Sequence, residues 1–172
     1  MKPARLAVLG LGVVCVVAIG IGLVAAQKKN GGDGMEQIAA PKEVRDALHR
    51  AADAYPQPLK GARWTSVAQL QGTEHGLYQV RGTNDRGAMI EIEVTSAGRV
   101  IEVEEHGIPF SEVPRVVIDV LKAHVPHFQP EWAEAIYQIG RAAPVAYGFE
   151  GRDAAGKETE VYVSAETQTI LN

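Results

Sequence analysis

Cysteine is nearly absent from this chain of 172 residues: Cys15 is the single one. It lies in the apolar segment that begins the sequence, so the remainder has no disulfide, no thiolate nucleophile and no cysteine-ligated metal. A lipoprotein acceptor cysteine follows a small residue, whereas Cys15 follows Val13 and Val14. We therefore do not expect lipid attachment at this position.

Basic residues are also in short supply. Asp and Glu number 21 against 17 Lys and Arg, for a net charge of −4, and two of those cations, Lys2 and Arg5, precede the expected folded part. A nucleic-acid-binding surface needs clustered Lys and Arg, so a nucleic acid partner is excluded. An acidic body suits a basic partner or a divalent cation, or simply keeps the protein in solution.

The sequence also lacks recognisable catalytic and metal-binding motifs. No serine stands in a Gly-x-Ser-x-Gly turn. His124 and His127 have a spacing that could share a metal on a helix, but Pro126 ends the helix between them and no third ligand is evident nearby. We predict a non-enzymatic protein with no catalytic residues, no metal and no cofactor. An envelope hydrolase ranks last among the functions considered.

What the sequence does have is a long apolar start. Residues 6–26 are all apolar or glycine after a short basic stretch, and Val24, Ala25 and Ala26 place small residues where signal peptidase cleaves. The run is longer than the ~7–15 residues of a usual signal peptide and close to the ~20 that span a bilayer. Residues 1–26 are therefore a signal peptide or an N-terminal membrane anchor, and residues 27–36 a Gly-rich linker. Both alternatives place the body outside the cytoplasm, with any membrane contact made through residues 6–26.

The body is similar to itself at a fixed spacing. A shift of 69 positions brings Tyr78 onto Tyr147 and Gly82 onto Gly151, and it also aligns flanking apolar and glutamate positions. One constant offset over helix, turn and strand positions predicts an internal duplication.

Each half has the same pattern of predicted elements. A stripe of apolar residues at helical spacing, from Val44 to Tyr55, precedes four runs with strand character, and the pattern recurs after Ser111. We predict an α+β fold of two tandem modules, each one helix followed by a four-stranded antiparallel sheet. The predicted boundaries are residues 37–108 for the first module and 109–172 for the second.

These features resemble a known family. The run Val113-Pro114-Arg115-Val116-Val117, a proline that ends the helix, a tyrosine in the second strand and the acidic hairpin Ile90-Glu91-Ile92-Glu93-Val94 are similar to PepSY-like domains. That family includes bacterial β-lactamase-inhibitor-like proteins. The resemblance spans residues 41–172 and implies a tandem of sheet modules with an inhibitory or chaperoning role. It does not carry over individual inhibitory residues, because this chain lacks the disulfides of the β-lactamase inhibitory protein.

A face of acidic side chains is the main candidate site. Strand alternation directs Ile90, Ile92 and Val94 toward a helix and the intervening glutamates away from it. The predicted partner-binding residues are Glu91, Glu93, Glu102, Glu104, Glu160 and Tyr162. Like charges across a hairpin cost a few tenths of a kcal/mol, so their accumulation calls for a reason. The alternatives are a solvated sheet face and a surface for a basic partner.

The function that fits these observations best is binding in the cell envelope. We expect a non-enzymatic protein, with a protein or peptidase inhibitor among the possibilities, that contacts an unidentified protein or peptide through the acidic face. The alternative is a membrane-held sensor of a small ligand or a divalent cation.

Overall fold

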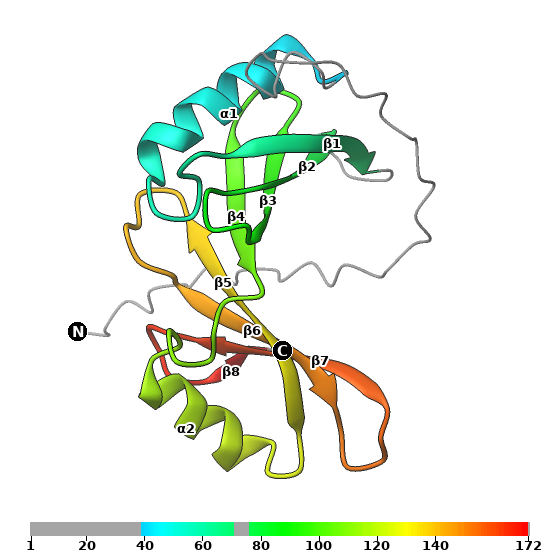
Figure 1. Ribbon diagram of the computed structural model, residues 1–172, viewed down its shortest axis with the longest axis vertical. Coiled ribbons are helices and arrows are strands. Elements are labelled where there is room, and N and C mark those ends of the chain that lie inside the picture. Colours follow the sequence, from blue (N-terminus) through cyan, green and yellow to red (C-terminus); the bar gives the residue numbers. More distant parts are fainter. Residues whose placement is uncertain (1–38, 71–75, 172) are drawn as a thin grey trace, which may run out of the picture.

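The computed structural model describes residues 39–70 and 76–171 (Figure 1). The predicted signal or anchor segment and the linker at 27–36 lie outside the described residues. The elements are α1 (Lys42–Ala54), β1 (Arg63–Leu70), β2 (Leu77–Thr83), β3 (Met89–Thr95), β4 (Val100–His106), α2 (Arg115–His124), β5 (Gln129–Gln138), β6 (Ala146–Arg152), β7 (Glu158–Ser164) and β8 (Ile170–Leu171). None of the helices in the described ranges is long and apolar enough to cross a membrane.

The strands form one antiparallel sheet of eight, ordered β1 to β8 as in the sequence. The predicted fold class, two tandem modules with a four-stranded sheet each, is therefore wrong. β4 pairs with β5 over five residue pairs, among them Val103 with Tyr137 and Glu104 with Ile136. Two separate sheets would each leave a strand edge with unpaired N–H and C=O groups. Pairing β4 with β5 satisfies both edges and makes the sheet continuous; the module boundaries proposed at residue 108/109 stay a prediction.

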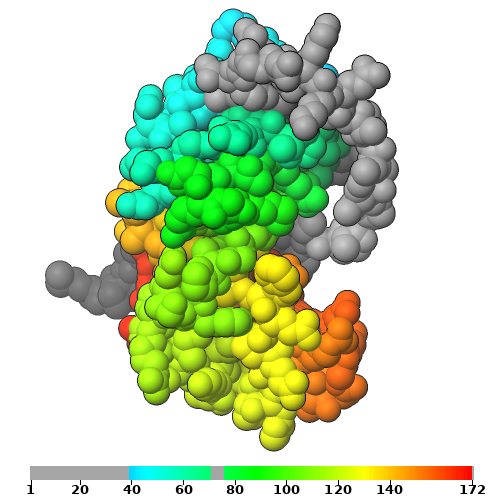
Figure 2. Space-filling model, in the orientation of Figure 1, coloured from blue at the N-terminus to red at the C-terminus, as the bar shows by residue number. Residues whose placement is uncertain are grey.

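Both helices pack on the same face of this sheet. α1 contacts β3 and β4, whereas α2 contacts β7 and β8, and Figure 1 shows the two helices at opposite ends of the molecule. The stripe predicted on α1 is confirmed, since Val44, Leu48, Ala51 and Tyr55 are all buried. Core residues from both halves form one apolar cluster. The space-filling view accordingly shows one elongated body (Figure 2).

Two hairpins of the sheet share the same register. Tyr78 pairs with Val94 in the first half, and Tyr147 pairs with Val163 in the second. Gly82 and Gly151 each lie beside a β-bulge, where a Cβ would approach a backbone carbonyl oxygen to 2.4 Å and 2.1 Å respectively. Glycine is required at both places because backbone cannot move aside as a flexible side chain can. The internal duplication itself stays a prediction.

A buried ionic network lies on the helix-facing side of β4. Glu105 is 1% exposed and binds the guanidinium of Arg86, which also contacts Glu112 at 3.1 Å. Asn84 donates to the same Glu105 carboxylate at 2.6 Å. The network connects the β2–β3 turn with β4, and the half-exposed ion pair of Arg86 with Glu112 extends it to the segment before α2.

Candidate functional site

The face of the sheet opposite the helices carries the candidate site, which we call the acidic face. Strand pairing places on it one set of side chains from β2 to β7. The set comprises Arg81, Glu91, Glu93, Glu102, Glu104, His106, Glu134, Glu150, Glu160 and Tyr162. All six residues proposed from the sequence are among them. Because the sheet is continuous, the four predicted glutamates of β3 and β4 share one surface with Glu160 and Tyr162 of β7.

The carboxyl groups of β3 and β4 are crowded together. Glu91 pairs with Glu104 across the hairpin and Glu93 pairs with Glu102. Burial, and after it the charge of Glu104, raises the pKa of Glu93 to about 7. The same two causes raise the pKa of Glu102 to about 8. This face therefore retains protons on carboxyl groups near neutral pH, a behaviour that is enriched at functional sites.

Glu91 is the best compensated carboxylate of the group. Its side chain is 7% exposed and lies 2.6 Å from Arg81 Nε, and Gln79 on β2 donates a second hydrogen bond to it. Burial nevertheless dominates and raises the pKa of Glu91, with Glu104 as the next cause. The prediction of a solvated sheet face does not hold for this residue, which is buried among charged neighbours.

His106 joins the two halves of the acidic face. Its Nδ1 lies 2.7 Å from Glu134 and its Nε2 lies 3.2 Å from Glu104, although the second contact lacks hydrogen-bond geometry. Burial acts to lower the pKa of His106, but the carboxylates of Glu104 and Glu134 override it and raise the pKa to about 10. The ring is therefore an imidazolium at neutral pH, placed between carboxylates of β4 and β5.

The second half contributes another acidic group. A carboxylate oxygen of each of Glu134, Glu150 and Glu160 lies within 4.8 Å of the others. Glu134 can lie flat over β6 because its neighbour there is Gly148, where a Cβ would come within 2.3 Å of Glu134 Oε1. Tyr162 donates to Glu160 at 2.6 Å, and burial followed by this hydrogen bond raises the pKa of Tyr162.

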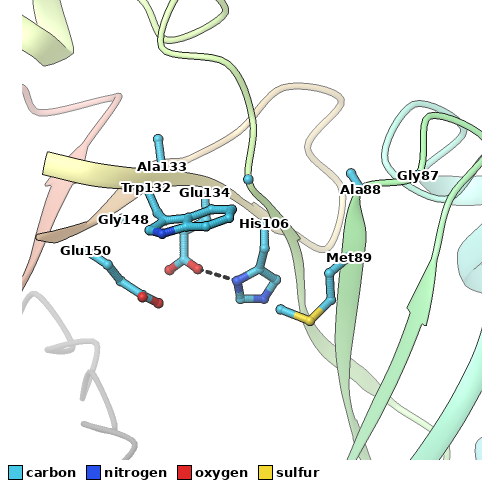
Figure 3. Close-up of a pocket in the computed structure, with 10 residues that line it drawn as sticks. Gly87, Ala88, Met89, His106, Trp132, Ala133, Glu134, Gly148 and Glu150 are labelled. Carbon is cyan, nitrogen blue, oxygen red and sulfur yellow. Dashed lines mark ion pairs between the residues drawn. The ribbon is translucent and has the colours of Figure 1, made fainter.

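A cavity of about 500 Å³ opens beside this group. Figure 3 shows the Trp132 indole, the Glu134 and Glu150 carboxylates and the His106 ring on one side, with Met89 reaching in from β3. Trp132 is 62% exposed and pairs with Glu150 across β5 and β6. Trp64, by contrast, is 5% exposed and belongs to the core.

Two groups of side chains have the spacing of metal ligands. They are Glu91, Glu104 and His106, and separately Glu134, Glu150 and Glu160. In the first group the imidazole carries a proton and would have to release it before coordinating a metal. The second group offers carboxylate oxygens alone, which suits a hard cation such as Ca²⁺ rather than a transition metal.

Sequence reasoning missed several members of the acidic face: Arg81, His106, Glu134 and Glu150. Glu134 and His106 become neighbours only through the β4–β5 pairing, which the prediction of separate sheets did not include. The alternation of Trp132, Glu134 and Ile136 in β5 was the available signal, since it marks an outward-facing row of the kind already recognised in β3.

Comparisons with known proteins support the fold. A DUF2874 family protein from Bacteroides uniformis superposes with a TM-score of 0.56 at 14% identity, over 77% of this chain and 87% of that one. A BLIP-like protein from Bacteroides fragilis gives a TM-score of 0.52 at 16% identity, over 77% and 83%. A protein described as a candidate periplasmic protein, from Bacteroides eggerthii, gives 0.55 at 12%, over 77% and 86%.

These similarities show a BLIP-like fold. No family model matches the sequence, and no curated protein matches it either. The PepSY-like resemblance is not named among the structural neighbours, so at the level of family it stays a prediction.

Proposed function

We propose that this protein acts in the cell envelope as a non-enzymatic binding protein that holds a basic protein or peptide on its acidic face. One observation carries the proposal: seven glutamates from five adjacent strands face the same side of one sheet, away from both helices. A fold gains no stability from carboxylates held this close, since their charges repel and their burial costs solvation. Residues that destabilise a fold are retained where a ligand uses them.

The partner is expected to be cationic. The cations on the acidic face, Arg81 and His106, are already engaged with Glu91, Glu104 and Glu134, so the remaining carboxylates leave the surface negative. A complementary partner would present Lys and Arg, and its association would be accelerated by the field of this face. The BLIP-like neighbour and the neighbour described as a candidate periplasmic protein fit an inhibitor-like role outside the cytoplasm.

Reversing charge on the acidic face tests this function. With the partner recovered from an envelope extract by immobilised protein, the Glu93→Lys/Glu102→Lys variant is expected to associate about tenfold more slowly at low salt, with a weaker salt dependence. Folding should be preserved, because the carboxylates of Glu91 and Glu104 lie close enough to compensate the two introduced lysines. The measurement is association kinetics at two ionic strengths, together with thermal unfolding of both proteins.

The matched control is Asp53→Lys/Asp119→Lys, which introduces the same number of lysines on the exposed surfaces of α1 and α2. It should associate at close to the rate of the unmodified protein. If both double variants associate equally, net charge alone steers the partner and the acidic face is not its binding surface.

A divalent cation is the second candidate ligand, favoured by the three carboxylates of Glu134, Glu150 and Glu160. Bound cation would stabilise the folded state by mass action. At 100 times its dissociation constant, Ca²⁺ is expected to add about 2.7 kcal/mol, read as a rise in melting temperature that Glu150→Gln abolishes. A melting temperature insensitive to millimolar Ca²⁺, Mg²⁺ and Zn²⁺ would exclude the sensor function.

A further inference from the structure

The cavity beside Trp132 has features that the rest of the acidic face does not share. It combines an exposed aromatic ring, carboxylates and a thioether within about 500 Å³, a volume in the range of pockets that bind small molecules and large enough for one side chain of a partner. This cavity is therefore a place where a single group of the partner can be recognised in detail.

The Trp132 ring lies against the backbone of Gly107. Its six-membered ring packs over Gly107, where an added Cβ would lie 3.4 Å from Cζ3. Gly107 has a φ of +69°, a left-handed conformation that favours glycine. An exposed indole that packs against backbone on one side loses less conformational freedom on binding than a fully free one, which favours a role as an interface hot spot.

The charge of the cavity is negative. Glu134 is compensated by His106 at 2.7 Å, whereas Glu150 on β6 is exposed and makes no hydrogen bond or ion pair with any residue in the described part of the chain. Glu150 lies opposite Trp132 in the strand pairing. A free carboxylate next to an indole face combines two groups that both attract a cation.

We propose that this cavity receives the guanidinium group of one arginine side chain from the basic partner, stacked on Trp132 and paired with Glu150. Arginine fits better than lysine because its planar guanidinium stacks on an aromatic ring and binds a carboxylate through two N–H groups. Met89 supplies apolar contact for the arginine methylenes. The inference rests on the proposed function, since it names the group by which the basic partner is recognised.

The test uses a small probe and needs no partner. N-acetyl-arginine amide is titrated into the full-length protein, and the indole N–H signals of the two tryptophans are followed by NMR. The chain offers an internal control, because Trp64 is buried and Trp132 exposed. The Trp132 signal should move saturably, with millimolar affinity, while the Trp64 signal stays in place.

Two variants and two further probes decide the outcome. Glu150→Gln should weaken the binding of N-acetyl-arginine amide about five- to tenfold, and Glu166→Gln, an exposed carboxylate in the β7–β8 turn, should leave it unchanged. N-acetyl-citrulline amide, the neutral analogue, should not bind. Equal binding by citrulline or by N-acetyl-lysine amide, or no movement of the Trp132 signal at all, overturns the arginine assignment. If the arginine probe does not bind, the association kinetics of the Glu93→Lys/Glu102→Lys variant still test the proposed function independently.

Discussion

Replacing Arg86 by methionine is expected to lower the free energy of unfolding by about 3–5 kcal/mol, the cost of leaving a buried charge without its partner. The Glu105 carboxylate is 1% exposed and faces the apolar core beside Ile90. After the substitution Asn84 would still donate one hydrogen bond to Glu105, but the positive charge would be gone. Urea unfolding followed by circular dichroism measures the loss.

Two further variants separate this explanation from a general effect of losing an arginine. Arg141→Met removes an ion pair with Glu166 in which both side chains are about half exposed, so it should cost no more than about 1 kcal/mol. Arg86→Met combined with Glu105→Leu removes both charges and should regain most of the stability lost in the single variant. A single Arg86→Met variant as stable as the unmodified protein would show that Glu105 is not held by charge.

Local structure was predictable because the apolar pattern of each element is strong. The order of the elements follows the apolar patterns, with α1 before β1 to β4 and α2 before β5 to β8. The period-two pattern from Ile90 to Val94 correctly separated the two faces of the strand, since Glu91 pairs with Glu104 whereas Ile92 pairs with Val103. The periodicity of apolar residues, and the face of the strand that each side chain takes, depend on neighbours along the chain. A single sequence therefore contains the information needed to predict them.

The assembly of the strands was not predictable in the same way. Whether β4 pairs with β5 depends on how the chain turns between residues 107 and 128, a segment that includes α2. A repeat in the sequence suggested two independent units, but hydrogen bonding at the strand edges favours one sheet. The prediction of two sheets therefore separated Glu104 and His106 from Glu134, which are in fact the centre of the acidic face.

Individual side chains also departed from the repeat. Trp64 and Trp132 are not equivalent: Trp64 opens a bulge and faces the core, whereas Trp132 follows the bulge of β5 and faces outward. A bulge changes which residues point to which face, and a one-residue difference in alignment is enough to turn a core tryptophan into a surface one. Glu105 shows the converse, since a charged residue at the end of an acidic run takes a core position that Arg86 and Asn84 make tolerable.

The acidic face has a second consequence, for the pH dependence of stability. Glu93 and Glu102 have folded-state pKa values of about 7 and about 8, above their ordinary value of 4.5, and His106 has one of about 10 against 6.5. All three groups thus hold protons in the folded state at pH values where the unfolded chain has released them. Because the folded state binds more protons, the free energy of unfolding must fall as pH rises.

The pH windows of these groups overlap but differ in their upper limits. The contribution of the two glutamates is present below pH 4.5 and is lost as pH rises through about 7 and 8. The contribution of His106 is complete below pH 6.5 and is lost as pH rises through about 10. We expect the protein to be about 2–4 kcal/mol less stable at pH 9 than at pH 5, a figure reduced from the full ~1.4 kcal/mol per pKa unit because these side chains are partly exposed.

Variants test which residues cause the free energy of unfolding to fall as pH rises. Glu93→Gln/Glu102→Gln should flatten the fall between pH 5 and 8 and stabilise the protein by about 1–2 kcal/mol at pH 8, whereas the exposed pair Glu131→Gln/Glu158→Gln should leave the slope as it is. His106→Asn should remove the part of the slope that persists above about pH 8, where the two glutamates no longer contribute. The measurement is urea unfolding at several pH values, and a free energy of unfolding that increases from pH 5 to 8 would contradict the arrangement.

The same titration makes the acidic face more negative over this range, so a basic partner should associate faster at pH 8 than at pH 5.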